Sequence, residues 1–264
     1  MIEEEAVNYF RKLFNESGPN TILDQLRVIR LFPRFIDEET RIKLEAPTTL
    51  KEIKYVLGHF AKDKIPSLDG WTVEFFLHFF ELLGLDIHAA VEESRLSSSV
   101  CGGLNTTFIA LIAKSEKPLN FNDYRPIFLC NLLYKVITKI ISNRLKPVLS
   151  LFLSKNQFGL LENHQIMDII DIAQEAFHSL KANKRKGIVL KLDLHKAYDC
   201  IRWDFLRLLI LQIGLSLSMV DWIMGCISSA TFVAIINGGP TYFFKSSRGI
   251  RKGCPLSSPL YILY

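Results

Sequence analysis

The chain has 264 residues, of which 49% are hydrophobic and 22% charged, and its formal net charge is +5. This composition excludes wholesale disorder, and the length allows a large core. The five cysteines stand singly, so we expect reduced thiols and neither a disulfide framework nor a zinc site. The N-terminus carries no secretory signal, and no uncharged run reaches the roughly 18 residues that span a bilayer. We therefore expect no membrane role and an intracellular, non-secreted protein.

The first hundred residues carry helical patterns. Apolar spacing predicts a helix over 5–15, and Thr49 with Glu52 has the T-x-x-E pattern of a capping box at the start of a second helix. A phenylalanine-rich run follows a turn at Pro66–Gly70 and is more simply explained as core than as a site. We expect residues 1–104 to form a helical N-terminal extension.

The middle of the chain predicts a strand followed by a helix. The segment Thr106–Ile112 has the composition of a buried strand, with Lys114 just past its end. A polar loop comes next, and then a strong helix capped by Asn131. One face of this helix is basic, which is more often a solvated face than a nucleic-acid contact. That basic face consists of Lys135, Lys139, Arg144 and Lys146.

A second strong helix is predicted over about 164–181, with its apolar stripe in the core. After the basic loop KANKRK, residues 188–194 alternate as a strand does, with four aliphatic side chains on one face and Asp193 on the other. We expect this strand to lie inside the sheet. Asp193 then either faces a ligand near the strand end or caps the following turn.

The last third of the chain completes the predicted architecture. It carries a helix over about 202–213, a β-hairpin around Asn237–Pro240 and the start of a helix near Pro255. The order of elements predicts an α/β (α+β) domain with helices behind a small sheet.

Asp193 is the first candidate for chemistry. A carboxylate at a strand end suits Mg²⁺, which takes oxygen ligands and few protein carboxylates. Nucleotidyl transfer by two such ions normally needs more than one converging carboxylate. Asp199 is expected to point elsewhere because a turn separates it from Asp193. From the residues alone, Asp193 belongs either to an incomplete metal site or to no catalytic site.

Six segments in the same order resemble the reverse transcriptase of non-LTR (LINE-type) retrotransposons, most closely those of plants. They are KIPSLDGWTVEFF, LNTTFIALIAK, FNDYRPIFLCNLLYKVITKIISNRLKPVL, LSKNQFG, GIVLKLDLHKAYD and INGGPTYFFKSSRGIRKGCPLS. The resemblance implies a right-hand polymerase with fingers and a partial palm over 105–264. It also implies an RNA template, a DNA primer, deoxynucleoside triphosphates and two Mg²⁺ ions as partners.

The resemblance assigns metal and sugar contacts to the segment GIVLKLDLHKAYD. Asp193 matches the first metal-binding aspartate of the palm, and the carbonyl oxygen of Leu194 is the expected second ligand. Tyr198 matches the aromatic residue beneath the incoming sugar, where it excludes a 2′-hydroxyl group.

The resemblance assigns the triphosphate to Lys114 and Arg125 in the fingers. A guanidinium offers a fork of donors and an ammonium a point charge, and both suit phosphate. The loop from Arg248 to Pro255, which includes Lys252 and Gly253, matches the loop that supports the nucleotide and the template.

Several positions depart from the family pattern. Lys252 stands where the family has glutamine, and Phe128 stands where it has a small residue. The aromatic-Ala-Asp-Asp block that supplies the remaining metal ligands does not occur before Tyr264. We therefore expect a C-terminally truncated domain that is inactive on its own. The alternatives are a non-catalytic nucleic-acid binder, which would use the KANKRK loop and the basic helix face, and an unstable remnant.

Overall fold

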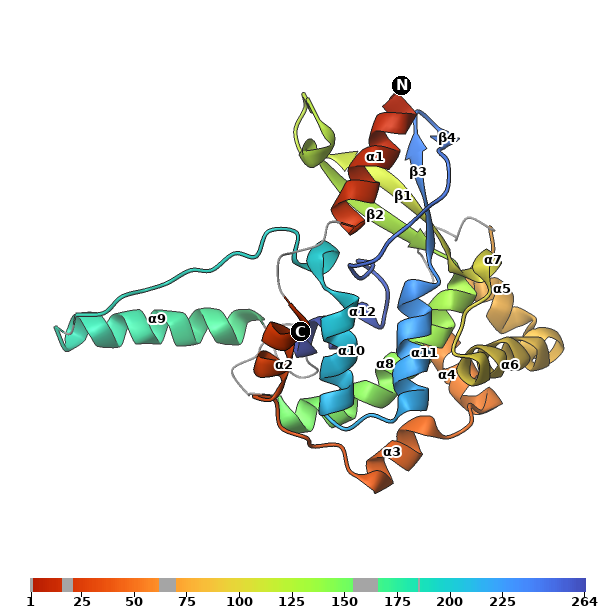
Figure 1. Cartoon of the computed structure of the whole chain (residues 1–264), viewed down its shortest axis with the longest axis horizontal. Helices are drawn as coiled ribbons and strands as arrows, with labels where there is room; N and C mark the ends of the chain where they lie inside the picture. Colours follow the sequence, from red (N-terminus) through yellow and green to blue (C-terminus); the bar gives the residue numbers. More distant parts are fainter. Residues whose placement is uncertain (1, 16–20, 62–69, 154–165, 185) are drawn as a thin grey trace.

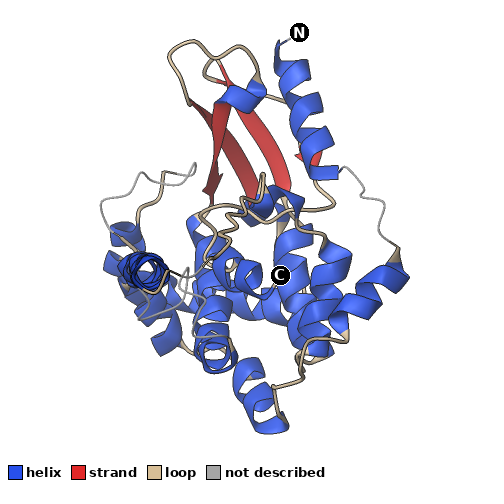
Figure 2. Cartoon of the chain, turned by 90° about the vertical axis from the view of Figure 1, so that its left-hand side faces the viewer, coloured by secondary structure: helices blue, strands red, loops and turns tan. Residues whose placement is uncertain are grey.

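The computed structural model describes residues 2–15, 21–61, 70–153, 166–184 and 186–264. A small sheet with one helix against it lies at one end, and most of the other helices pack below it (Figures 1 and 2). This arrangement confirms the predicted α/β class. The predicted turn at Pro66–Asp69 and nearly all of the segment LSKNQFG lie outside the described residues.

The sheet is mixed, in the order β2-β1-β3-β4, and β5 also pairs with β3. β1 runs antiparallel to β2, with Ile109 opposite Phe128, and parallel to β3, with Phe108 opposite Val233. The predicted strand at Thr106 is confirmed as β1. The strands are β1 (Thr106–Ala113), β2 (Tyr124–Cys130), β3 (Thr231–Ile236), β4 (Gly239–Pro240) and β5 (Phe244–Lys245).

The predicted hairpin is confirmed, with its turn at Asn237 and Gly238. Their φ angles are 50° and 82°. Two consecutive positive φ angles are typical of the type I′ turn, whose twist matches that of the flanking strands. The sequence did not predict strand β2, because the segment between the polar loop and Asn131 shows no strand-like alternation that we assigned to an element. A proline fits there because β2 is an edge strand.

Helix α1 (Ile2–Asn15) packs against the sheet (Figure 1). The rings of Phe10 and Phe244 stack with centroids 6.4 Å apart, and those of Phe14 and Phe232 lie 5.5 Å apart. Phe14 also contacts Phe128 at 6.2 Å. The large side chain at position 128 therefore fills space between the sheet and α1.

The helical layer is built around α8 (Leu132–Phe152), which buries Val136 and Ile140 and is capped as predicted by Asn131. The side-chain oxygen of Asn131 accepts the Leu133 N–H at 2.8 Å. The other helices are α2 (Ile22–Ile29), α3 (Glu38–Glu45), α4 (Leu50–Gly58), α5 (Val73–His78), α6 (Phe80–Ser97), α7 (Gly102–Asn105), α9 (Ile166–Ala182), α10 (Trp203–Gln212), α11 (Leu217–Ser228) and α12 (Ser257–Leu263).

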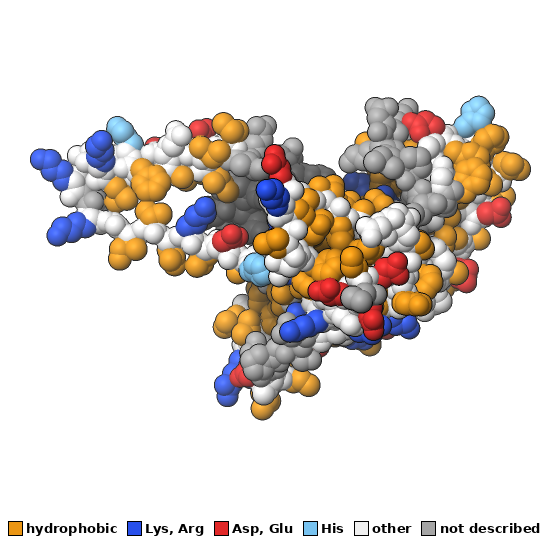
Figure 3. Space-filling view, turned by 90° about the horizontal axis from the view of Figure 1, so that it is seen from above, with side chains coloured by type: hydrophobic (Ala, Val, Ile, Leu, Met, Phe, Trp, Pro, Cys, Tyr) orange, Lys and Arg blue, Asp and Glu red, His pale blue; other side chains and the backbone are white. Residues whose placement is uncertain are grey.

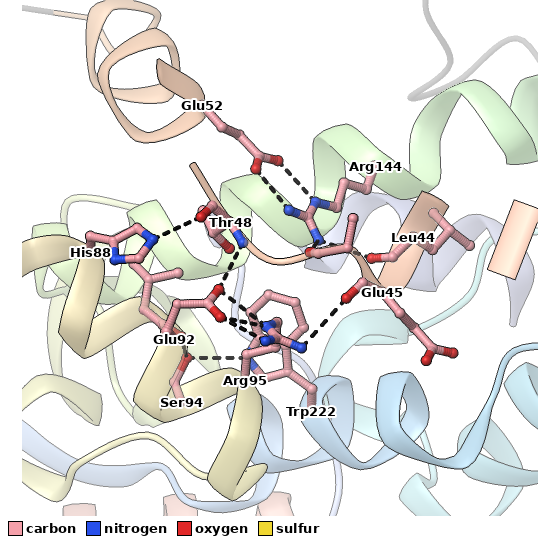
Figure 4. Close-up of polar contacts among 12 residues, drawn as sticks. Leu44, Glu45, Thr48, Glu52, His88, Glu92, Ser94, Arg95, Arg144 and Trp222 are labelled. Carbon is pink, nitrogen blue, oxygen red and sulfur yellow. Dashed lines mark hydrogen bonds and ion pairs between the residues drawn. The ribbon is translucent and has the colours of Figure 1, made fainter. Parts of the chain in front are cut away.

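Charged residues join the N-terminal helices to this layer (Figure 4). Arg144 of α8 donates to both carboxylate oxygens of Glu52 at 2.9 and 2.7 Å, and to the carbonyl oxygens of Leu44 and Ala46. Arg144 is therefore committed to these contacts, and the alternative of a nucleic-acid contact on the basic face does not hold for it. Thr49 accepts the Glu52 N–H as predicted, while the Glu52 side chain pairs with Arg144.

The prediction of a central strand over 188–194 is wrong. This segment pairs with no described strand, and its side chains are exposed, 98% for Ile188 and 78% for Leu192. Alternation determines which side chains share a face, but a strand also needs a neighbour for its N–H and C=O groups. No described strand lies beside residues 188–194 to pair with these groups.

The predicted second helix is confirmed as α9, but its burial is not. Met167, Ile170 and Phe177 are 58%, 39% and 53% exposed. Helix α9 projects away from the body, and the segment 188–194 leads back from it (Figure 1). Seen from above, apolar side chains cover this projection and basic ones lie at its outer end (Figure 3). We call α9 and residues 183–194 the arm, within the described part of the chain.

Candidate functional site

A cavity of about 510 Å³ lies between α1, the ends of β1 and β2, and the loop before α12. Four of the predicted nucleotide-binding residues line it: Lys114, Arg125, Lys252 and Gly253. Lys114 and Arg125 flank the β1–β2 connection, and Lys252 and Gly253 come from a loop that is distant in the sequence. The described lining also includes Tyr9, Lys196 and Asp199, and it carries four basic side chains and one acidic one. Such a balance favours an anionic ligand.

A short turn between β1 and β2 positions Lys114. The turn is the 3₁₀ helix η1 (Phe121–Asp123), and the Asn120 side chain caps it by accepting the Asn122 N–H at 2.9 Å. The Lys114 N–H donates to the Asp123 carbonyl at 2.8 Å, and its ammonium donates to the Asn122 carbonyl at 2.6 Å. The lysine is therefore held at the cavity by a neutral acceptor.

The loop before α12 is bonded to the turn that follows the arm. This turn is the 3₁₀ helix η2 (Ala197–Cys200). The Gly249 N–H donates to the Ile201 carbonyl at 2.7 Å, and the Ile250 N–H donates to the Tyr198 carbonyl at 2.9 Å. Gly249 has φ +86°, and a Cβ atom there would lie 2.9 Å from the Asp199 carbonyl oxygen. Only glycine fits this close approach.

Two adjacent basic residues of the loop point in opposite directions. Arg251 is buried and donates to the side chains of Asn105 and Thr107 at 2.6 and 2.9 Å. Its guanidinium also lies 3.9 Å from the Tyr134 ring centroid. Burial raises the pKa of Tyr134, so its ring stays neutral above the cation. Lys252 instead lies at the cavity, and the anchored Arg251 holds it there.

Lys252 pairs with a carboxylate at the cavity. Its ammonium lies 3.1 Å from Oδ2 of Asp199, whose side chain is 2% exposed. The other oxygen, Oδ1, is buried and accepts no hydrogen bond from the described residues. The lysine at position 252 therefore gives the buried carboxylate of Asp199 its counter-charge.

Two predicted residues lie outside the described lining of the cavity. Arg248 donates to the Leu13 carbonyl through Nε at 2.9 Å and through Nη2 at 2.8 Å. A guanidinium bound to the last carbonyls of a helix satisfies free acceptors there, so Arg248 caps α1. Tyr198 stacks on Tyr261 of α12 with ring centroids 4.4 Å apart. Burial raises the pKa of Tyr198, and the neighbouring Tyr261 raises it further.

The predicted metal ligands are not assembled. Asp193 and Leu194 lie in the exposed segment, and no three His, Cys, Asp or Glu side chains converge among the residues described. Asp199, the nearest carboxylate in sequence, is committed to Lys252. The described residues therefore do not fit a magnesium site, although reverse transcriptases generally use Mg²⁺.

The structure adds residues to the cavity that the sequence did not indicate. Tyr9 and Lys196 line it, and Asn122 bonds to both. Tyr9 precedes Asn122 by 113 positions, so no local pattern could bring them together. Lys196 lies inside a recognised motif, but its role depends on the fold of the turn after the arm.

Comparisons with known proteins show the family of the chain. The model of the reverse transcriptase (RNA-dependent DNA polymerase) family matches residues 112–264, which is more than half of the chain. The chain belongs to the reverse transcriptase family.

Two curated relatives are transposon proteins. The chain is 29% identical over 267 residues to the transposon TX1 uncharacterized 149 kDa protein of Xenopus laevis, covering 99% of this chain and 20% of that protein. It is 24% identical over 160 residues to a retrovirus-related Pol polyprotein from the type-1 retrotransposable element R2 of Popillia japonica, covering 60% of this chain and 22% of that protein. The chain spans about a fifth of the length of these relatives. No described helix is long and apolar enough to cross a membrane.

Proposed function

We propose that the chain forms the fingers and part of the palm of an RNA-directed DNA polymerase from a non-LTR element, and that its cavity binds the triphosphate of an incoming deoxynucleotide. The observation that carries the proposal is the convergence of Lys114, Arg125, Lys252 and Gly253 on one cavity. An RNA template and a DNA primer are the remaining partners, which the longer protein would hold. The likeness of the six motif segments to plant elements supports a plant source, and the life cycle of such elements supports a nuclear or cytoplasmic location.

The chemistry of the lining supports a polyphosphate ligand. Arg125 can offer two parallel N–H donors to one phosphate, and Lys114 is a point charge from the neighbouring strand end. The cavity volume of about 510 Å³ lies within the range usual for small-molecule sites. Asp199, which is the one acidic residue of the described lining, is neutralised by Lys252, so it does not cancel the other cations.

Equilibrium dialysis of the purified chain against a labelled deoxynucleoside triphosphate tests the proposal. We expect binding that Arg125→Gln and Lys114→Gln each weaken about tenfold, since a hydrogen bond to a charged group contributes about 1.5–3 kcal/mol. Lys117→Gln is the matched control, because Lys117 is an exposed lysine of the same β1–β2 connection outside the described lining.

Three outcomes would overturn the proposal: no binding by the wild-type chain at low salt, equal binding of the nucleoside without phosphates, or unchanged binding in both variants. Binding of single-stranded nucleic acid without nucleotide binding would favour a non-catalytic nucleic-acid binder instead. Circular dichroism of each variant verifies that the chain remains folded.

A further inference from the structure

We infer that Lys196 is an additional phosphate-binding residue of this cavity, and that Tyr9 of α1 and Asn122 of η1 position its ammonium. The inference rests on the proposed nucleotide site and extends it to α1. Helix α1 lies outside residues 112–264, which the reverse transcriptase family model matches, so that match assigns no role to Tyr9.

The backbone of Lys196 is strained. Its φ angle is 50°, in the left-handed region that residues other than glycine, asparagine and aspartate seldom adopt. Such strain persists only where the surrounding structure enforces it, and it is frequent at functional sites. Here Lys196 immediately precedes η2, whose backbone is bonded to the glycine-containing loop. The strained conformation sends the side chain toward α1 and η1.

Two neutral acceptors hold the ammonium of Lys196. It donates to the Tyr9 hydroxyl oxygen at 2.8 Å and to Oδ1 of Asn122 at 2.7 Å. The Tyr9 hydroxyl itself donates to the same Oδ1 at 2.8 Å. The phenol proton is thereby committed to Asn122, and the lone pairs of the Tyr9 oxygen face the lysine. These three groups form a closed triangle at the cavity.

The charge of Lys196 is not compensated within this triangle. Neither acceptor is anionic, and no described carboxylate forms an ion pair with the ammonium. The one acidic residue of the described lining, Asp199, pairs with Lys252. A held cation without a counter-ion, beside Lys114 and Arg125, is suited to a multiply charged anion. A nucleoside triphosphate has that chemistry.

Helix α1 fixes the position of Tyr9. The Tyr9 ring packs against Phe10 at 5.1 Å and Phe121 at 5.4 Å, and Arg248 caps the end of the helix. The Tyr9 oxygen therefore stays at a defined distance from the turn that carries Lys114. Tyr9 acts through Lys196 and is a positioning residue, not a catalytic one.

Nucleotide affinity measured by equilibrium dialysis on four single variants tests the inference. Lys196→Gln removes the charge, and Tyr9→Phe removes only the hydroxyl group. The control for the first is Lys184→Gln, because Lys184 is exposed and has the same left-handed φ of 50°. The control for the second is Tyr55→Phe, an exposed tyrosine of α4 that contacts His59.

We expect Lys196→Gln to weaken triphosphate binding about tenfold and Tyr9→Phe about threefold, with both controls unchanged. In a double-mutant cycle, Tyr9→Phe should cause no further loss once Lys196 is replaced, because its effect passes through that ammonium. If Tyr9 had a merely structural role, Tyr9→Phe would instead reduce triphosphate affinity by the same factor in wild type and in Lys196→Gln. Inorganic tripolyphosphate should compete with the nucleotide for binding to wild type, and it should compete less well for binding to Lys196→Gln.

The inference is overturned if Lys196→Gln binds as Lys184→Gln does, or if the Tyr9 effect is independent of Lys196. If either result occurs while Arg125→Gln and Lys114→Gln still weaken binding, the nucleotide site stands and only this inference fails. If wild type binds no triphosphate, the proposed function fails and the inference with it. Far-UV circular dichroism and the melting midpoint of each variant verify the fold.

Discussion

The ammonium of Lys252 lies 3.1 Å from the carboxylate of Asp199, and the pair joins the loop before α12 to the turn that follows the arm. Asp199 is almost fully buried, whereas the Lys252 side chain is 41% exposed. The lysine that departs from the family pattern thus neutralises a carboxylate that has no other charged partner among the described residues. A glutamine at this position could still donate one hydrogen bond to it.

Replacing Lys252 should therefore show whether its charge or its hydrogen-bond donation to Asp199 stabilises the fold. Lys252→Met leaves a buried carboxylate without a donor, and we expect it to lower the free energy of unfolding by about 2 kcal/mol. Lys252→Gln retains a donor and should cost less than half as much. Urea denaturation measures both variants, and equal stability of Lys252→Met and wild type would contradict the expectation.

Acid should weaken the junction between α6 and the N-terminal segment (Figure 4). Burial raises the pKa of Glu92, but hydrogen bonds from Arg95 and the Thr48 N–H outweigh it and lower the pKa to about 2. A carboxyl group whose pKa is lower in the folded than in the unfolded state stabilises the fold fully at pH values above its unfolded-state pKa. That stabilisation is lost as the pH falls toward its folded-state pKa. We therefore expect part of the unfolding free energy to be lost between about pH 5 and pH 2.

The variant Glu92→Gln tests this pH dependence. At pH 7 it should be less stable than wild type by about 1–2 kcal/mol, because Arg95 loses its charged partner, and the difference should shrink below pH 4. Thermal denaturation at several pH values measures the effect, with the exposed neighbour changed in Glu93→Gln as control. A difference that is constant with pH would show that Glu92 is not the titrating group.

The helices before residue 105 should unfold together with the rest of the body. Arg144 of α8 binds Glu52 and the carbonyl oxygens of Leu44 and Ala46, so its loss leaves several acceptors unpaired. We expect Arg144→Met to reduce the free energy of unfolding by about 2–3 kcal/mol while leaving a single transition. Two separate transitions in wild type or variant would support an N-terminal extension that folds as its own domain.

The arm should promote self-association. Leu190 and Leu192 are 77% and 78% exposed in an unpaired segment, which is an available edge for pairing with another chain. We expect sedimentation velocity to show association that rises with concentration, and Leu190→Lys with Leu192→Lys to suppress it without changing the melting midpoint. The control is Leu119→Lys, since Leu119 is 90% exposed but lies in the β1–β2 connection. Association unaffected by the double change would exclude the arm as the contact.

Primer extension is expected to be absent for this chain by itself. Asp193 is exposed and no second or third acidic ligand converges on it among the described residues, so two metal ions cannot be clamped there. Wild type and Asp193→Ala should therefore give the same background in a template-directed assay with Mg²⁺. Extension by wild type above that variant would contradict the expectation.

Local patterns predicted individual elements well and their burial less well. The caps at Thr49 and Asn131, the Asn237-Gly238 turn and the helix α9 all follow from interactions within a few residues. The apolar stripe of α9 and the alternation of 188–194 indicate what could be buried, but burial also needs a covering element. The pattern of a segment does not show whether the chain provides an element to cover its apolar face.

The candidate site was only partly accessible from the sequence. Lys114, Arg125 and Lys252 were identified by motif, and the structure brings them together. Arg248 belongs to the same motif but caps α1, because the carbonyl of Leu13 lies beside its guanidinium. Tyr9 could not be identified, because its role depends on α1 packing against a sheet that is formed much later in the chain.

The packing of α1 has a consequence for where this domain can be cut. The family match begins at residue 112, inside β1, yet Phe10 and Phe14 cover the aromatic side chains of Phe232 and Phe244. A protein fragment started at the family boundary would lose part of a central strand and expose those rings to water. The stretch that the family model matches is thus smaller than the unit that folds, and N-terminal boundaries for expression should be placed before α1.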